Sequence, residues 1–168
     1  MRVTDTHIYF WGSYLSNFYW APFTVQDITY HSSEQYFMMC KAIQFDDFDA
    51  AEKILNAHDA KAAKALGRKV KNFDVNVWDE HSLPAMLDAV LYKFEEPNNI
   101  VIRERLLETG NKILVEASPL DKIWGVGLHE DDDLILNESN WLGENRLGEV
   151  LMRVRVILQE TSSYEDNL

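Results

Sequence analysis

The sequence is poor in the residues that build disulfides, metal centres and phosphate-binding loops. Its single cysteine, Cys40, excludes an intramolecular disulfide and is typical of a reducing compartment. The five histidines have no metal-ligand spacing, and CxxC, HExxH and carboxylate-rich calcium loops are absent. The seven glycines form no loop of the P-loop or Rossmann type. We therefore expect neither a metal nor a cofactor.

Long apolar runs are missing as well. No stretch approaches the roughly 18 consecutive apolar residues of a membrane span. Residues 1–7 contain no apolar signal segment. We therefore expect a cytoplasmic protein with no membrane partner.

Positive charge is scarce, with 16 Lys and Arg against 28 Asp and Glu and a net charge of −12. This balance argues against sequence-independent binding of nucleic acid, which needs many contacts from Lys and Arg to phosphate. One basic cluster at near-helical spacing could contact an anionic ligand, although a solvated helix face is the commoner meaning of such a charge run. Its members are Lys61, Lys64, Arg68, Lys69 and Lys71.

Apolar residues are plentiful enough for one good core. The chain of 168 residues is 46% hydrophobic and 12% aromatic, which predicts a single globular domain over residues 1–168, with a short flexible tail from about residue 161. Residues 1–31 are aromatic and strand-like, with a hairpin turning near Gln26 and Asp27. Helical patterns follow. The fold class is therefore α+β, a mainly helical single domain with a small antiparallel β element.

Capping residues and apolar spacing predict where the helices lie. Ser32 and Gln35 form a capping-box pattern that opens a helix over residues 33–44. Two short helices are expected next, from Asp46 or Asp47 to about Asn56 and from Asp59 to Gly67. A long helix should follow, with Ser82 as a possible cap, Pro84 near its start and apolar positions through Phe94. Two more are expected, from Asn98 or Asn99 to Thr109 and through the apolar positions from Leu147 to Leu158. A short strand is expected over residues 112–117.

Glu34 and Lys41 are the first candidates for chemistry. They lie seven residues apart in the first of these helices, so they return to nearly the same face two turns apart. A carboxylate and an amine in one space can move protons, and a desolvated amine can attack a sugar carbon. The alternative is an ordinary solvated pair. Cys40 beside two methionines is better interpreted as a small buried hydrophobe than as a nucleophile.

Three loop segments are further candidates, each with a plainer alternative. In residues 115–127, Trp124 could stack on a flat base or a nicotinamide, or could be a core residue beside a tight turn. Residues 140–148 could bind an anion at a helix N-terminus, or Asn145 could simply cap that helix. Ser16 and Asn17 could face a polar ligand or form a turn.

Several blocks, in order from about Tyr9 to Leu158, resemble the NADAR (NAD- and ADP-ribose-associated, YbiA-like) family. The blocks are Phe10-Trp11-Gly12, Leu15-Ser16-Asn17-Phe18, residues 29–41, Ala63-Lys64-Ala65-Leu66-Gly67-Arg68, Trp78 with Met86, Leu107-Glu108-Thr109-Gly110, residues 114–119, residues 121–127, Trp141-Leu142-Gly143-Glu144-Asn145 with Leu147-Gly148, and residues 151–155.

The resemblance implies a YbiA-like fold and a hydrolase, an N-glycosidase acting on ribosides. By residue matching, it implies catalytic roles for Glu34, for Lys41 as an imine-forming lysine, and for Asp121. It also implies a substrate site that includes Asn17, Phe18, Tyr36, Glu116, Trp124, Gly125 and Asn145. The substrate expected first is ADP-ribosylated guanine, so that the reaction reverses ADP-ribosylation.

Alternatives remain open. The first is cleavage of ribosylaminopyrimidine phosphates, which are intermediates of riboflavin synthesis. The second is a module that binds ADP-ribose or another NAD-derived nucleotide without cleaving it. Two departures from the family pattern bear on this choice: Ser82 replaces a frequent Arg, and Val126 replaces an acidic residue of some riboflavin-pathway members. The sequence does not decide whether the base is free or within nucleic acid, nor the oligomeric state.

Overall fold

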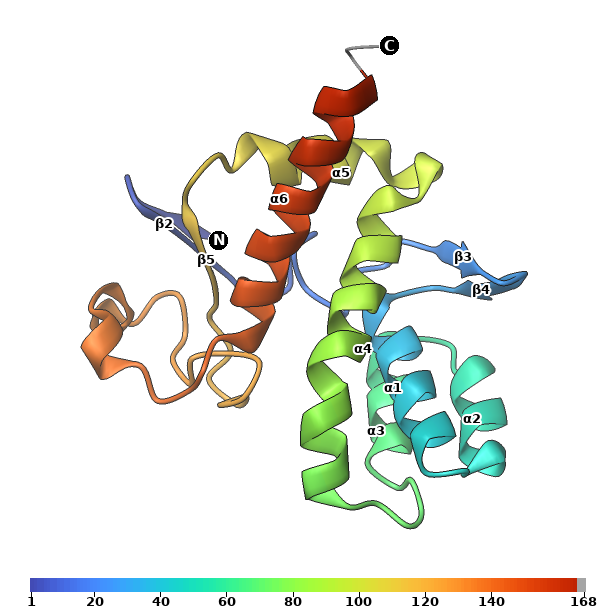
Figure 1. Cartoon of the computed structure of the whole chain (residues 1–168). Coiled ribbons are helices and arrows are strands. Elements are labelled where there is room, and N and C mark those ends of the chain that lie inside the picture. Colours follow the sequence, from blue (N-terminus) through green and yellow to red (C-terminus); the bar gives the residue numbers. More distant parts are fainter. Residues whose placement is uncertain (166–168) are drawn as a thin grey trace. The chain divides into compact units, whose positions relative to one another are not determined.

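The computed structural model describes residues 1–165 and is mainly helical, with two small sheets (Figure 1). This confirms the predicted α+β class. In chain order the elements are β1 (Arg2–Val3), β2 (His7–Phe10), β3 (Phe23–Val25), β4 (Ile28–Tyr30), α1 (Ser33–Gln44), α2 (Phe48–Leu55), α3 (Ala60–Gly67), α4 (Val75–Glu95), η1 (Pro97–Asn99), α5 (Ile100–Glu108), β5 (Ile113–Glu116), η2 (Asp133–Leu136), η3 (Glu138–Asn140) and α6 (Arg146–Glu165).

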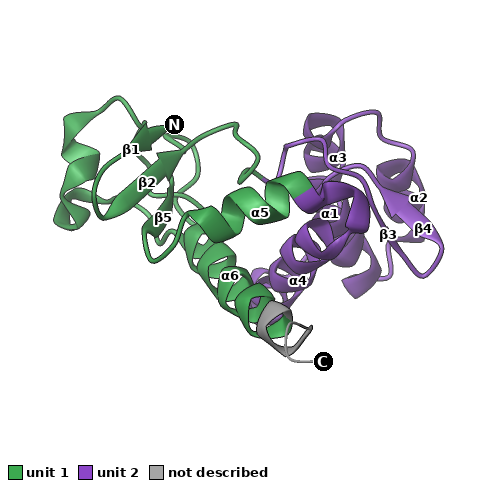
Figure 2. Cartoon of the chain, turned by 90° about the horizontal axis from the view of Figure 1, so that it is seen from above, with its two compact units in different colours: residues 1–16, 101–168 green, residues 17–100 purple. Residues whose placement is uncertain are grey.

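The chain forms two compact units, coloured separately in Figure 2. Unit 1 combines residues 1–16 with the chain from residue 101 onward, and unit 2 contains residues 17–100. Each unit has its own set of packed elements, and the two are described separately.

In unit 1, a three-stranded sheet in the order β1-β2-β5 packs against α6 (Figure 1). β1 pairs with β2 in the antiparallel sense, but β2 and β5 pair in parallel, with His7 opposite Ile113. This parallel pair was not expected, because it joins segments about a hundred residues apart, and parallel strands need a long crossover connection. Gly148 lets α6 approach closely, since an added Cβ would collide with the carbonyl oxygen of Leu114.

In unit 2, α1 packs against α2, α3 and α4, beside the hairpin of β3 and β4. The predicted turn is confirmed: Gln26 and Asp27 have φ values of 48° and 65°, as a two-residue hairpin turn of the I′ type requires. α1, α2 and α3 begin after Ser32, Asp47 and Asp59, whose side chains each accept a hydrogen bond from the first turn. These three predicted helices are confirmed.

The predicted start of the long helix is wrong. α4 begins at Val75, because Asp74 caps it by accepting hydrogen bonds from the backbone N–H groups of Asn76 and Val77. Pro84 therefore lies inside the helix, where it removes one backbone donor. The Ser82 hydroxyl is buried and donates to the carbonyl oxygen of Asp79 at 3.3 Å, so it caps nothing.

The end of the chain differs in part from expectation. α6 continues to Glu165, so the segment from residue 161 to that point is helical, and the rest of the predicted tail lies outside the described residues. Among residues 1–165, no helix combines the length and apolarity that crossing a membrane would require.

Lys93, near the end of α4, is a buried lysine that the sequence patterns did not single out. Its side chain is 1% exposed, and its Nζ lies 5.0 Å from the ring centroid of Phe94 and 5.7 Å from that of Tyr19. Burial lowers the pKa of Lys93 to about 7, because the charged form loses its hydration. Folding therefore favours the neutral amine at this position.

We expect replacement of Lys93 by methionine to stabilise unit 2 at pH 7. Above the folded pKa of about 7 and below the ordinary value of 10.5, the unfolded chain binds more protons at this residue. Wild-type stability should therefore rise with pH across this window, and Lys93→Met should remove that part of the rise. The measurement is the free energy of unfolding by urea at pH 7 and pH 10, with the exposed Lys53→Met as control. Lower stability of Lys93→Met at both pH values would contradict the prediction.

Candidate active site

The start of α1 is fixed by hydrogen bonds from buried polar side chains. Ser32 Oγ accepts from the backbone N–H of Gln35 at 3.3 Å, which confirms the predicted cap. Gln35 Oε1 accepts from the backbone N–H of His31, and its Nε2 donates to the carbonyl oxygens of Ile54 and Leu55. The first turn of α1 is thereby tied to the hairpin and to the end of α2.

Glu34 lies in this fixed first turn and is 4% exposed. Its backbone N–H donates to the carbonyl oxygen of Asn17 at 3.1 Å. The positive end of the helix dipole favours a carboxylate at this position. The side chain is therefore held in a buried, oriented place rather than on a solvated surface.

Lys41, in the last turn of α1, is only partly exposed, and its Nζ lies 4.2 Å from the ring centroid of Phe73. Burial lowers the pKa of Lys41, the negative charge of Glu34 opposes that change, and the positive charge of Arg68 adds to it. The mutual influence of Glu34 and Lys41 agrees with their predicted common face. The neutral, nucleophilic fraction of the amine is raised above that of a solvated lysine.

Asn17 has an unsatisfied acceptor near the start of α1. The side chain is 5% exposed, and its Nδ2 donates to the sulfur of Met86 at 3.0 Å. Its Oδ1 is buried and, among the described residues, makes no hydrogen bond. Buried amide oxygens almost always have a partner, so a ligand N–H or O–H would complete this group. The adjacent Phe18 is exposed, with Lys64 Nζ 5.3 Å from its ring centroid.

Tyr36 does not share the face of Glu34. Two residues turn an α-helix by about 200°, and the Tyr36 ring lies 5.0 Å from Tyr30, 5.6 Å from Tyr92 and 6.0 Å from Phe23, centroid to centroid. Burial raises the pKa of the Tyr36 phenol above its ordinary value. The substrate contact implied for Tyr36 stays a prediction, and within unit 2 this residue packs among aromatic rings.

Cys40 lies beside Tyr36 and is also unsuited to act as a nucleophile. Burial raises the pKa of its thiol to about 11, although a hydrogen bond with Tyr36 opposes the change. Since the thiolate is the reactive form, little of the thiol is reactive near neutral pH. This agrees with the interpretation of Cys40 as a small hydrophobe.

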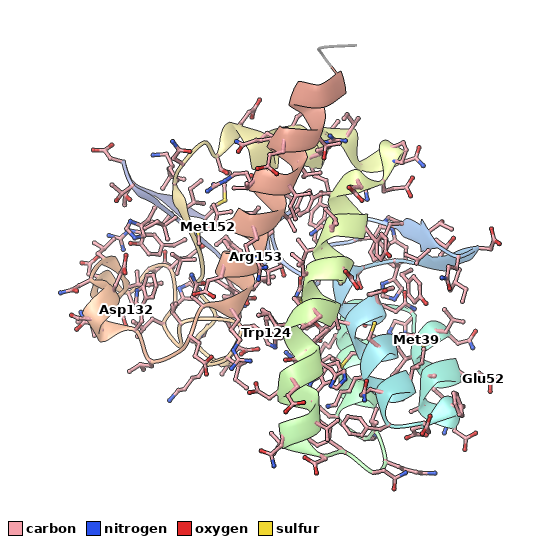
Figure 3. The ribbon with its side chains drawn as sticks, viewed as in Figure 1. Met39, Glu52, Trp124, Asp132, Met152 and Arg153 are labelled. Carbon is pink, nitrogen blue, oxygen red and sulfur yellow. The ribbon has the colours of Figure 1, made fainter. Side chains whose placement is uncertain are left out.

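In unit 1, Asp121 organises the loop that carries Trp124. Its Oδ1 accepts from the backbone N–H groups of Ile123 at 3.0 Å and Trp124 at 2.8 Å. The partly buried Trp124 lies beside the start of α6 (Figure 3), and the backbone N–H of Leu147 donates to its carbonyl oxygen. Asp121 and Trp124 are thus held in one hydrogen-bonded turn.

Gly125 follows Trp124 and is buried against protein backbone. An added Cβ would lie 2.9 Å from the carbonyl oxygen of Glu116 and 3.0 Å from that of Asp121. The close approach that this glycine permits is therefore made by the chain itself. Val126 is fully buried in the apolar core of unit 1, and its backbone N–H donates to Glu116.

Asn145 is committed to the protein backbone. Its Oδ1 accepts from the N–H of Glu116 and its Nδ2 donates to the carbonyl oxygen of Leu114, both at 3.0 Å, and it is 4% exposed. The side chain of Asn145 therefore holds the end of β5 in place, while its carbonyl oxygen accepts from the backbone N–H of Glu149 in α6. Of the two alternatives for the start of α6, an anion site has fewer donors to offer, because the N–H groups of Arg146 and Leu147 donate to loop carbonyl oxygens.

The structure therefore gathers the candidates in two sets. In unit 2, Asn17, Glu34 and Lys41 are linked through the start and face of α1, with Phe18 adjacent and Tyr36 turned away. In unit 1, Asp121, Trp124, Gly125, Glu116 and Asn145 share one hydrogen-bonded loop region. Within residues 1–165, no three His, Cys, Asp or Glu side chains gather in a way that could hold a metal ion.

Sequence reasoning missed Lys93, although a signal was present. The residue follows Ala89 by four positions and Val90 by three, and both of these are fully buried positions of α4. A lysine on such a stripe is expected to be buried with them.

The chain is similar to known proteins in both sequence and fold. The family model for the NADAR domain matches residues 9–159. The chain is 44% identical over 126 residues to N-glycosidase R617 of Acanthamoeba polyphaga mimivirus, covering 75% of this chain and 73% of that protein. It is 33% identical over 168 residues to riboflavin biosynthesis protein VVA0006 of Vibrio vulnificus, covering 97% of this chain but only 41% of that protein.

The fold has a solved counterpart. The NMR structure of the E. coli protein YbiA matches with a TM-score of 0.74 and 29% sequence identity, covering 96% of this chain and 89% of that one. The predicted YbiA-like fold is thereby confirmed.

We expect Asn145→Ala to destabilise the protein by about 2–5 kcal/mol, because two buried backbone groups lose their partners. The exposed Asn56→Ala, which loses one bond to the carbonyl oxygen of Glu52, should cost about 1 kcal/mol. Urea unfolding at constant m-value measures both. Wild-type stability of Asn145→Ala together with lost activity would instead indicate a direct substrate contact.

Proposed function

Because the chain belongs to the NADAR domain family, we propose that this enzyme, a hydrolase of N-glycosyl compounds, removes ADP-ribose from ADP-ribosylated guanine. The observation that carries the proposal is the buried Glu34 on one helix face with Lys41, whose pKa burial lowers. The mimivirus relative, named an N-glycosidase, supports this reaction class. We also propose that the enzyme acts in the cytoplasm and on a small riboside. The roles given below to the site residues are part of this proposal.

The proposed mechanism begins with attack of the neutral Lys41 Nζ on ribose C1′. The bond between C1′ and the base nitrogen breaks, and its electron pair leaves with the base. Lys41 loses one proton and the departing base gains one, with Glu34 as the group that moves it. The C1′–O4′ bond of the ribose ring then breaks, the remaining N–H proton of Lys41 passes to O4′, and an imine forms between Lys41 and C1′.

Water completes the reaction. Its oxygen adds to C1′, the bond to Lys41 breaks, and the free sugar and the neutral amine are restored. We assign Asp121 to stabilise positive charge at C1′ or to activate this water, and Trp124 to pack on the base or ribose. Atoms and charge balance without an oxidant, a reductant or any co-reactant other than water.

Asn17 and Phe18 supply the recognition that we propose for unit 2. The buried Oδ1 of Asn17 accepts an N–H or O–H from the substrate, which removes its unsatisfied state. The exposed ring of Phe18 offers an apolar face for a base or ribose. Glu116 lies at the end of β5, and Asn145 acts through its hold on the backbone of that residue.

Cleavage of ribosylaminopyrimidine phosphates is the second candidate. It is favoured by the Vibrio vulnificus relative named a riboflavin biosynthesis protein, of which the chain spans 41%. The Val126 departure carries less weight than expected, because this side chain lies in the core and not at a ligand-facing surface. A non-catalytic module that binds ADP-ribose is the third candidate.

The test of the imine uses borohydride with substrate. Wild type should be trapped as a covalent adduct, and Lys41→Ala should lose base release to background without an adduct, because the nucleophile is absent. Mass spectrometry of the adduct and the rate of base release are the measurements, with exposed Lys53→Ala as the control. No adduct, with full activity in Lys41→Arg, would leave carboxylate-assisted hydrolysis by Glu34.

The test of the substrate compares ADP-ribosylated guanosine with ribosylaminopyrimidine phosphate under identical conditions. We expect free guanine-containing product from the first and a much slower reaction with the second. Faster release from the pyrimidine would favour the riboflavin intermediate. Tight binding of ADP-ribose with no release from either substrate would favour the binding module.

A further inference from the structure

The basic cluster on α3 places three of its cations on one face. Lys61, Lys64 and Arg68 follow i, i+3 and i+7 spacing, which returns to nearly the same side of a helix. Lys61 and Arg68 are exposed and Lys64 is half-buried. In a chain with a net charge of −12, this is a local concentration of positive charge.

The C-terminal end of this face lies next to the catalytic helix. Gly67 packs so closely on Met38 of α1 that an added Cβ would collide with the methionine sulfur. Lys41 follows Met38 by three residues, on the adjacent turn of α1. Arg68 directly follows Gly67, and its positive charge lowers the pKa of Lys41. These observations put Arg68 close to the reacting amine.

The middle of the face lies next to the proposed recognition residues. Lys64 Nζ is 5.3 Å from the ring centroid of Phe18, within cation–π range. Phe18 follows Asn17, whose carbonyl oxygen holds the backbone N–H of Glu34. Lys64 therefore lies near Phe18 and Arg68 near Lys41, and both belong to α3 or its C-terminal end, which packs against α1.

We propose that Lys64 and Arg68 form a subsite for a phosphate or diphosphate of the substrate, beside Glu34 and Lys41. The inference rests on the proposed function and deepens it, since both candidate ribosides carry phosphate. Arg68 presents a planar fork of donors that matches phosphate oxygens, and Lys64 adds a mobile point charge. Lys41 must be neutral to attack C1′, and in this arrangement other cations bind the phosphate.

The experiment compares full-length wild type, the double variant Lys64→Ala/Arg68→Ala and the matched control Lys69→Ala. Lys69 is the exposed cation next to Arg68 but outside the i, i+3, i+7 face. Calorimetry measures binding of ADP-ribose, of pyrophosphate and of unphosphorylated ribose. Thermal unfolding checks that all three proteins are folded.

We expect the double variant to bind ADP-ribose on the order of 10- to 100-fold more weakly, because two charge-assisted contacts are lost. Pyrophosphate binding should be lost, ribose binding unchanged, and Lys69→Ala should match wild type. In turnover, KM should rise while kcat changes little, since these residues hold a group remote from C1′.

The two proposals fail in different ways. Wild-type affinity for ADP-ribose in the folded double variant would overturn the subsite, whatever the enzyme cleaves. Absence of ADP-ribose and pyrophosphate binding in wild type would overturn it as well. If wild type binds ADP-ribose through these residues but releases no base from either riboside, the subsite stands and the proposed reaction fails.

Discussion

One buried amide, that of Gln35, holds together the part of the molecule on which the proposed chemistry depends. Its oxygen accepts from His31 at the end of the hairpin, and its nitrogen donates to Ile54 and Leu55 at the end of α2. A buried amide of this kind is costly to leave unpaired, so α1 has one preferred start. Glu34 and Lys41 inherit their positions from that start.

In unit 1, Asn145 is the buried amide that fixes the local backbone. By bonding to both Leu114 and Glu116, it fixes the end of β5 at the point where the loop to Asp121 and Trp124 begins. The N-terminal N–H groups of α6 then bond to the carbonyl oxygens of that loop. A helix start that is used in this way has fewer donors to offer an anion than a free helix N-terminus has.

Local signals predicted the local structure well. The caps at Ser32, Asp47 and Asp59 were readable because a side-chain oxygen bonds to a backbone only three residues away. Pro84 misled the prediction for α4, since a proline typical of a first turn can also be tolerated within a long, well-packed helix. The helix begins at Val75 and not near Pro84, because Asp74 accepts two hydrogen bonds from the first turn.

Non-local features could not be predicted in the same way. The parallel pairing of β2 with β5 joins distant segments, and no turn residue encodes it. The roles proposed for Asp121 and Trp124 came only from family resemblance. The local hydrogen bond between them is of a common kind, because an Asp side chain often accepts from a backbone N–H two or three residues later in a turn. The two hydrogen bonds from the Asn145 side chain to β5 have no sequence signal, because both partners are backbone groups some thirty residues earlier.

A phosphorylated riboside makes opposite demands on the cations around it. An amine that attacks C1′ must be neutral, which partial burial next to Phe73 promotes, whereas a cation that holds phosphate must stay charged and hydrated. One lysine cannot meet both demands at once. Placing Lys41 on α1 and the exposed Arg68 at the end of α3 separates them. Burial lowers the pKa of Lys41, and the positive charge of Arg68 adds to that change. In a chain with a net charge of −12, such a local gathering of cations attracts an anionic substrate that the overall negative charge repels.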